Sequence, residues 1–208
     1  MKYKLMAASI YAIASFILGF SIQNGLIVFL GWNMILSTIP YLIAQSIKGK
    51  KRPAIIGLLG FLYVIFFPNS IYMTTDFIHF QNYTYFLEYP NIYAFNIQDW
   101  VIFSHVLIGV LLAIKLGMDS VNILRNTVST RYKIFREAGT FLLFLLSSGA
   151  IFIGRFLRFN SWEVFKIRRI FEQIWQEKGF FFQFILLYLM IHIVLFFIFK
   201  EKKEPKGS

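Results

Sequence analysis

Six apolar runs, each able to cross a lipid bilayer, constrain the fold of this chain more than any other feature. A transmembrane helix needs about 20 consecutive, mostly apolar residues. The runs cover residues 5–22, 26–47, 53–67 with a kinked extension to 79, 99–118, 138–157 and 179–199. This pattern predicts an all-α fold, a polytopic transmembrane helix bundle of about six spans.

The amino-acid composition agrees with a membrane protein. Of the 208 residues, 58% are hydrophobic and 15% are charged, whereas about half of a soluble domain is apolar and about a quarter is charged. We expect residues 1–199 to form a single bundle and residues 200–208 to form a basic C-terminal tail. The chain has no cysteine, which excludes disulfides and thiolate metal sites, and no cofactor is expected.

The positive charge of the chain is concentrated beside the apolar runs. The formal net charge is +11, and anionic lipid headgroups attract cations at such positions, so the charge indicates membrane lipids rather than nucleic acid as partners. Basic residues cluster near the N-terminus, at 48–52, within 119–137 and near the C-terminus. The positive-inside rule makes these segments cytoplasmic. Both termini are then cytoplasmic, and residues 119–137 form a polar linker, which is either a cytoplasmic surface helix or a loop.

The segment after the fifth run breaks this rule. Six cations would lie on the outer side: Arg155, Arg158, Lys166, Arg168, Arg169 and Lys178. Because translocating so many cations opposes the usual bias, either a functional or structural demand keeps them outside, or the fifth run does not cross the bilayer.

The same segment contains an apolar stripe at helical spacing. Its members are Val164, Ile167, Phe171, Ile174 and Trp175. The stripe predicts an amphipathic interfacial helix, beginning near Ser161 and lying on the membrane surface between the last two spans.

A group of polar side chains closes the third run. After Pro68, at spacings of three, four and three, come Asn69, Tyr72, Asp76 and His79. In a helix these four side chains share one face, and hydrocarbon cannot satisfy them, so they need a partner or a ligand. The best partner in the sequence is the segment 154–162, where Arg155 and Arg158 lie on one helix face.

The two motifs together resemble a known family. The first reads FPNxxYxxTDxxH over residues 67–79, and the second reads GRFLRFNSWE over residues 154–163. In this order they resemble the bacterial membrane-protein family known as domain of unknown function 1361, in which Asp is usual where this chain has Glu163. The resemblance implies a multi-pass protein of a bacterial cell membrane, and it implies no activity.

Two interpretations of the motifs stay open. In the structural one, Asp76 and Arg155 form an ion pair between the third and fifth spans, since a charge in a membrane is tolerated when it is paired. In the functional one, the arginines form an outward-facing site for an anionic lipid or a lipid-linked phosphate of cell-envelope metabolism, because two arginines one helical turn apart can hold a phosphate. The expected anion-binding residues are Arg155, Arg158, Asn69, Tyr72, Asn160 and Trp162.

Two further hypotheses leave open whether the protein is an enzyme. One is a non-catalytic partner subunit of a membrane transporter or envelope enzyme, suggested by the small size and the lack of a recognisable catalytic motif. The other is a membrane-embedded transferase or hydrolase that uses Asp76 and His79 as a base and its orienting group. No metal site is expected, because no standard ligand spacing is present.

Overall fold

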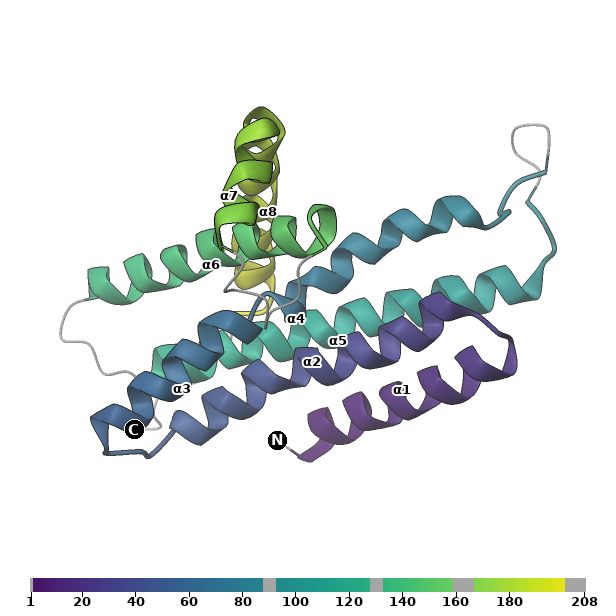
Figure 1. Cartoon of the computed structure of the whole chain (residues 1–208). Coiled ribbons are helices and arrows are strands. Elements are labelled where there is room, and N and C mark those ends of the chain that lie inside the picture. The colour runs from purple at the N-terminus through teal and green to yellow at the C-terminus, as the bar shows by residue number, and fades with distance from the viewer. Residues whose placement is uncertain (1, 88–92, 128–132, 159–166, 201–208) are drawn as a thin grey trace.

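The chain folds into helices throughout the part that the structure describes. The computed structural model (Figure 1) describes residues 2–87, 93–127, 133–158 and 167–200. The elements are α1 (Lys2–Ser21), α2 (Gly25–Ile47), α3 (Pro53–Phe66), α4 (Asn69–Tyr72), the 3₁₀ helix η1 (Met73–Asn82), α5 (Ile97–Thr127), α6 (Lys133–Phe156), α7 (Ile167–Gln176) and α8 (Lys178–Ile198). The predicted all-α fold is confirmed.

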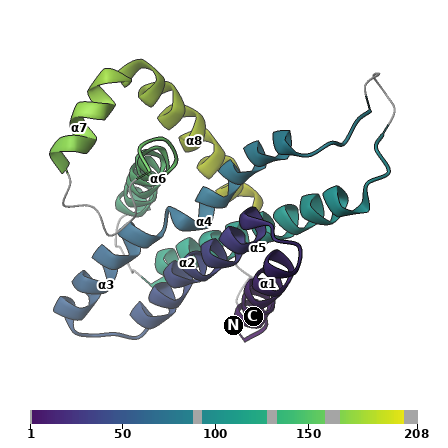
Figure 2. The ribbon, with the colours of Figure 1, turned by 45° about the vertical axis from the view of Figure 1, so that its right-hand side comes forward.

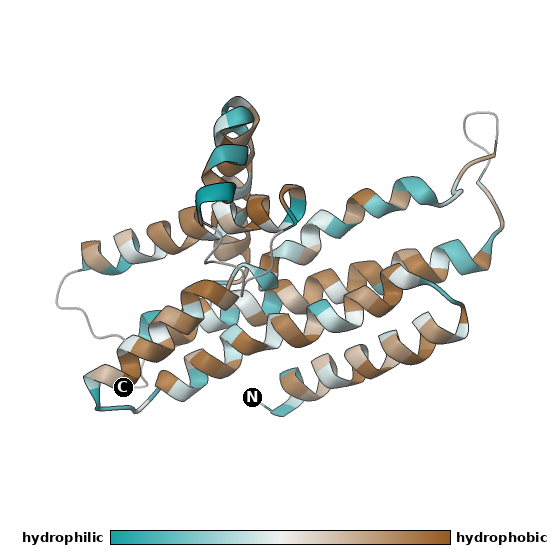
Figure 3. Ribbon diagram, in the orientation of Figure 1, coloured by the Kyte–Doolittle hydropathy of each residue, from teal (hydrophilic) through white to brown (hydrophobic). Residues whose placement is uncertain are grey.

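Six helical segments in the described part have the length and hydropathy of membrane spans. They are α1, α2, the continuous segment Pro53–Asn82, α5, α6 and α8. Figure 3 shows hydrophobic residues along most of these segments and hydrophilic residues gathered on η1 and α7. The protein is therefore a multi-pass helical membrane protein, as the six apolar runs predict.

The helices form two groups. α1, α2, α3 and α5 lie side by side with similar directions, whereas α6 packs mainly against α8 and crosses it steeply (Figures 1 and 2). Within the first group, close approach depends on small residues: a Cβ atom on Gly109 would collide with the Tyr11 side chain, and one on Gly117 would lie 2.5 Å from Cβ of Ser70. We call the boundary between the α1/α2/α3/α5 group and the α6/α8 pair the seam.

The third span changes its helix type near Pro68. α3 ends at Phe66, and after the short α4 the chain continues as η1, a 3₁₀ helix of 10 residues. Such a length is unusual, because 3₁₀ runs rarely exceed 3–4 residues. Two threonine hydroxyls support the tight turns: Thr74 donates to the Ile71 carbonyl and Thr75 to the Tyr72 carbonyl, both at 2.7 Å.

The described part of the expected linker at 119–137 is helical, which is one of the two expected alternatives, but the fourth span does not end near Met118 as predicted. α5 continues to Thr127 and α6 begins at Lys133. Asp119 lies inside α5 with its side chain 2% exposed, and it is paired with Lys4 of α1 and Lys115 of α5, each at 2.6 Å. Charge marks the end of a span only where it faces water, and here two ammonium groups neutralise the carboxylate within the bundle.

The expected interfacial helix is described as α7 from Ile167 onward. Phe171 and Trp175 are 67% and 72% exposed, while Ile174 packs toward the core. The first turns expected for this helix, with Ser161 and Val164, lie outside the described residues, as do residues 201–208 of the expected tail. The location of α7 on a membrane surface stays a prediction.

Candidate functional site

The two polar motifs meet at the seam, where the last turn of α6 reaches the start of η1. Nη2 of Arg155 lies 3.0 Å from Oδ1 of Asp76, and the same guanidinium donates to the backbone carbonyl of Thr75. The Asp76 side chain is fully buried, and that of Arg155 is 17% exposed. Asn33 of α2 also donates to Asp76, with Nδ2 3.4 Å from Oδ2. The structure thus brings Asp76 and Arg155 together across the seam.

Local structure explains how Arg155 reaches this position. It lies in the last turn of α6, where the partial negative charge of a helix C-terminus favours a cation. Its guanidinium carbon lies 5.4 Å from the ring centroid of Tyr72, over the ring, an arrangement in which the ring quadrupole attracts the cation. Arg155 is therefore held by a carboxylate, a carbonyl and an aromatic face, all contributed by the first motif.

Arg158 is placed by an unusual backbone conformation just beyond α6. Its φ is 56°, in the left-handed region that residues other than glycine rarely adopt. The residue is exposed, and among the residues that the structure describes it makes no ion pair. Strained backbone of this kind is often found at ligand sites, and here it places a second arginine beside Arg155.

The His79 ring contacts Arg155 and lies farther from Asp76. Nε2 of His79 is 3.5 Å from Nη1 of Arg155 and 4.0 Å from Oδ1 of Asp76. Since arginine only donates, Nε2 accepts and the ring proton belongs on Nδ1. The distance to Asp76 is longer than a hydrogen bond, so Asp76 does not orient the imidazole in this arrangement.

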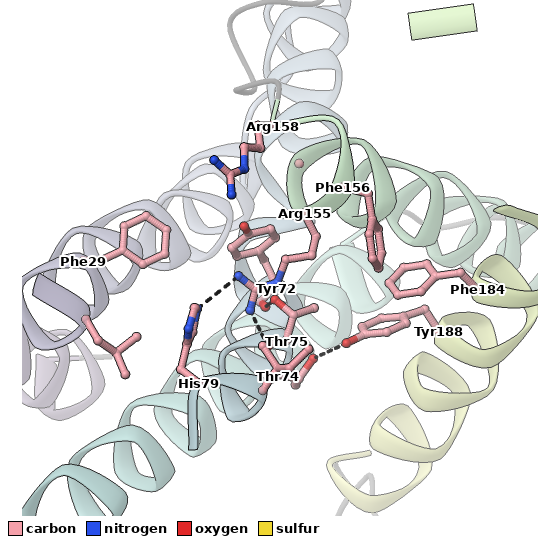
Figure 4. Close-up of a pocket in the computed structure, with 13 residues that line it drawn as sticks. Phe29, Tyr72, Thr74, Thr75, His79, Arg155, Phe156, Arg158, Phe184 and Tyr188 are labelled. Atoms are coloured by element: carbon pink, nitrogen blue, oxygen red, sulfur yellow. Dashed lines mark hydrogen bonds between the residues drawn. The ribbon is translucent and has the colours of Figure 1, made fainter. Parts of the chain in front are cut away.

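These residues line an open cleft with a volume of about 900 Å³. Its polar lining consists of Tyr72, Thr74, Thr75, His79, Arg155, Arg158 and Tyr188, and its apolar lining consists of Leu26, Phe29, Ile78, Phe156 and Phe184 together with Gly154. Figure 4 shows Phe29 and His79 on one side of Arg155, and Phe156, Phe184 and Tyr188 on the other. The cleft is therefore cationic at its centre and aromatic at its flanks.

Not every expected residue belongs to this cleft. The Asn69 side chain donates to the Phe66 carbonyl at 3.0 Å, and Asn69 is absent from the cleft lining. Its amide stabilises the junction of α3 and α4, and its expected role as an anion-binding residue stays a prediction. Asn160 and Trp162 lie outside the described residues.

Sequence reasoning missed several residues that build the cleft. The Tyr188 hydroxyl of α8 lies 3.3 Å from Oγ1 of Thr74, and Phe184 stacks on Tyr188 with a ring distance of 4.4 Å. Phe29 comes from α2. Thr74 lies inside the first motif, and Tyr188 is a hydroxyl within an apolar run. Those two signals could have been noticed, whereas Phe29 and Phe184 look like any other lipid-facing aromatic.

The other two histidines of the chain are bonded within the helix packing. Nε2 of His105 lies 2.8 Å from the Ser15 hydroxyl, and its ring stacks on Tyr11. His192 is fully buried, with Nδ1 2.7 Å from the Tyr188 carbonyl and Nε2 2.9 Å from the Ser147 hydroxyl. No group of three or more His, Asp or Glu side chains able to hold a metal occurs among the described residues.

The fold and the cleft define a class: a multi-pass helical membrane protein in which the arginine of an ion pair between two spans lines an open cationic cleft. Residues 32–198 match the model of the family described as "Protein of unknown function (DUF1361)". The chain belongs to this family, and the resemblance drawn from the two motifs is confirmed. Neither a curated protein nor a solved structure gives a significant match.

Proposed function

We propose that the protein binds the anionic headgroup of a lipid or lipid-linked phosphate on the outer side of a bacterial cell membrane, as part of cell-envelope metabolism. The observation that carries this proposal is the pair of arginines in one cleft: both Arg155 and Arg158 line it, next to aromatic side chains. A ligand with a phosphate and a hydrocarbon chain matches both kinds of lining.

The cationic part of the cleft suits a phosphate. A guanidinium presents five donors in a planar fork, and one carboxylate cannot occupy all of them. Asp76 and the Thr75 carbonyl fix the position of Arg155, while Arg158 adds a second cation at the mouth of the cleft. Charge-assisted hydrogen bonds to phosphate are stronger than bonds between neutral groups, so a pre-positioned arginine pair favours an anion over a neutral ligand.

The apolar part of the cleft suits a lipid chain. The rings of Phe156 and Phe184 lie edge to face at 5.1 Å, on the side of the cleft formed by α6 and α8. Leu26 and Phe29 of α2 line the opposite side. Burial of apolar surface contributes about 25 cal/mol per Å², which favours an amphiphile over a free phosphate ion.

The geometry favours binding over acid–base chemistry. A transferase or hydrolase that used Asp76 and His79 would need the carboxylate to orient the imidazole, and the two side chains are 4.0 Å apart. Asp76 is fully buried, so His79 alone would meet the ligand. The alternative hypothesis, a non-catalytic partner subunit, needs a surface that contacts a second protein. Lipid binding needs only the cleft between the spans.

The basic segment 48–52 supports the outward orientation of the cleft, although the cations near Arg155 oppose the usual bias. The basic segment 48–52 follows α2 at the end of the bundle where α1 begins, and the positive-inside rule assigns that end to the cytoplasm. The cleft, formed by the last turn of α6 and the first half of α8, lies at the other end.

Lipid titration of two arginine variants tests the proposal. The purified protein in detergent would be titrated with a polyprenyl monophosphate and, separately, with phosphatidylcholine, and binding would be counted by native mass spectrometry. We expect Arg158→Gln to weaken polyprenyl phosphate binding about tenfold or more, since a hydrogen bond to a charged group contributes about 1.5–3 kcal/mol. The matched control is Arg168→Gln on α7, whose side chain is 94% exposed. Equal binding by both variants, or no preference for the phosphate, would contradict the proposal.

A further inference from the structure

We propose a second lipid site at the opposite end of the seam, where one acyl chain of an anionic phospholipid occupies a groove and its phosphate binds Arg136. This site is separate from the cleft at Arg155 and does not depend on the function proposed for that cleft. Its ligand belongs to the leaflet beside the N-terminus of α1.

The groove has a volume of about 260 Å³ and runs between α3, α5 and α6. Its lining is mostly apolar, with two arginines, a threonine and a glycine: Tyr63, Val64, Val121, Leu124, Arg125, Phe135, Arg136, Gly139, Thr140 and Leu143. A groove of this composition in the membrane-spanning part of a protein faces hydrocarbon rather than water.

The loose packing of α6 keeps the groove open. α6 packs mainly on α8 and only sparsely on α3. The part of the seam between α3 and the start of α6 therefore stays open as a groove. Gly139 of α6 lines the groove, and a Cβ atom built on it meets nothing within 4 Å. Unfilled apolar space loses dispersion contacts on its lining, and an acyl chain would restore them.

The charges at the groove favour an anionic headgroup. Residues 125–127 and 133–140 carry the cations Arg125, Lys133 and Arg136 and a single carboxylate, Glu137. Arg125 is held firmly: it donates to the Thr140 hydroxyl at 2.6 Å and to Glu137 at 2.7 Å, and it lies 4.9 Å from the Phe196 ring centroid. Glu137 is therefore engaged most closely by Arg125, and this one carboxylate also faces Arg136 and Lys133, so three cations share a single negative charge in this group.

Arg136 has one buried guanidinium donor without an acceptor. Its Nη2 forms an ion pair with Oε1 of Glu137 at 3.6 Å, which is longer than a hydrogen bond. Its Nε is buried and has no hydrogen-bond partner in the described part of the chain. A buried N–H without an acceptor is rare in folded proteins, so this donor points to a missing acceptor. A phosphate oxygen at the mouth of the groove would supply it.

The same charges argue for a lipid with a net negative headgroup. In phosphatidylcholine the phosphate is accompanied by a quaternary ammonium group, which Lys133 and Arg125 would repel. Phosphatidylglycerol carries the phosphate without that cation, so we commit to a lipid of its class as the occupant.

Two variants test the site by different means. Gly139→Leu would fill the groove without a clash at Cβ, and Gly57→Leu is its matched control, because Gly57 of α3 is exposed, is equally open at Cβ and lines neither cavity. Arg136→Gln would remove the phosphate contact and keep much of the side-chain volume. Both test variants replace residues that line the groove alone.

The probe is a phosphatidylglycerol with a photoactivatable diazirine in one acyl chain, incorporated in phosphatidylcholine nanodiscs. We expect crosslinks on the α5 and α6 peptides that carry Val121, Leu124 and Leu143. We expect Gly139→Leu and Arg136→Gln to reduce these crosslinks about tenfold, with Gly57→Leu unchanged. Equal crosslinking in Gly139→Leu and the wild type, or equal crosslinking by a diazirine phosphatidylcholine, would overturn the proposal. Crosslinks confined to the peptides of Phe29 and Phe184 would also overturn it and would support the cleft at Arg155 instead, so the two sites are tested separately.

Discussion

Two buried carboxylates, Asp76 and Asp119, are each paired with a cation from another span of this bundle. Asp119 receives Lys4 on one oxygen and Lys115 on the other, each at 2.6 Å. Asp76 has one ion pair with Arg155, and its second oxygen is only 3.4 Å from the amide nitrogen of Asn33. Both carboxylates are at most 2% exposed, so burial does not distinguish them.

The cations make the difference. Lys4 and Lys115 are 37% and 38% exposed, and each has a flexible stem with a compact charge that carboxylate oxygens can satisfy. Arg155 is 17% exposed and lines a cleft with a planar fork that one carboxylate cannot saturate. The Asp119 cluster therefore joins α1 to α5, whereas the Asp76 cluster both joins the spans and presents a cation to the cleft.

The largest effect is expected from Asp76→Ala. This change leaves Arg155 as an unpaired, mostly buried charge, which costs about 3–5 kcal/mol. The free energy of unfolding, measured by denaturant titration in detergent micelles, should fall by that amount. The exchange variant Asp76→Arg with Arg155→Asp should recover part of the folded yield that each single change loses, because it restores the pair. Normal stability of Asp76→Ala would mean that the ion pair does not hold the seam.

Asp119→Ala should cost less, about 1–2 kcal/mol. Both lysines are already partly exposed, and long amphipathic side chains can move their charge toward the membrane interface when the partner is lost. The same unfolding titration measures the loss. Binding of a polyprenyl phosphate should stay at the wild-type level, and a larger destabilisation than that of Asp76→Ala would reverse the comparison.

Arg158→Gly should separate stability from binding in the cleft. Its φ of 56° suits glycine, so the variant should gain about 1 kcal/mol in unfolding free energy by releasing backbone strain. It should lose lipid binding to the same extent as Arg158→Gln, as native mass spectrometry would show. A variant that binds normally would remove Arg158 from the site.

The smallest effect is expected from Tyr188→Phe. The change removes one neutral hydrogen bond, that between the Tyr188 and Thr74 hydroxyls, at a net cost of about 0.5–1.5 kcal/mol. Unfolding titration would measure it, with Tyr3→Phe as the control because Tyr3 is 81% exposed. A loss equal to that of Asp76→Ala would show that the seam depends on this hydroxyl pair rather than on the ion pair.

The prediction of the spans succeeded where the apolar runs of the sequence are enough to locate a helix. Apolar runs located the six candidate spans of the described residues, and the helix that follows the fifth span was found from its apolar stripe. The predicted end of the fourth span near Met118 was wrong, because the charge of Asp119 was taken as the end of a span and α5 continues to Thr127. Asp119 is neutralised partly by Lys4, more than one hundred residues away in the chain, and no local pattern contains that partner.

The candidate site divides in the same way. The spacing within each motif identified Tyr72, Asp76, His79, Arg155 and Arg158, because polar residues beside a membrane span need partners wherever they lie. It could not show that the Asn69 amide donates to the Phe66 carbonyl at the end of α3, because spacing does not show where α3 ends and α4 begins. It also could not find Phe29 or Phe184, whose role depends on α2 and α8 meeting at the cleft.

The sequence by itself determined the number of spans, the all-helical fold and the two polar motifs, because the length of apolar runs and the cost of unpaired polar groups in lipid are local properties. Only the tertiary structure decided which carboxylate is enclosed by its cations and which cation faces a cleft. Those outcomes depend on how the α6/α8 pair lies against the other spans, and that arrangement follows from packing between distant segments rather than from the periodicity of any one of them.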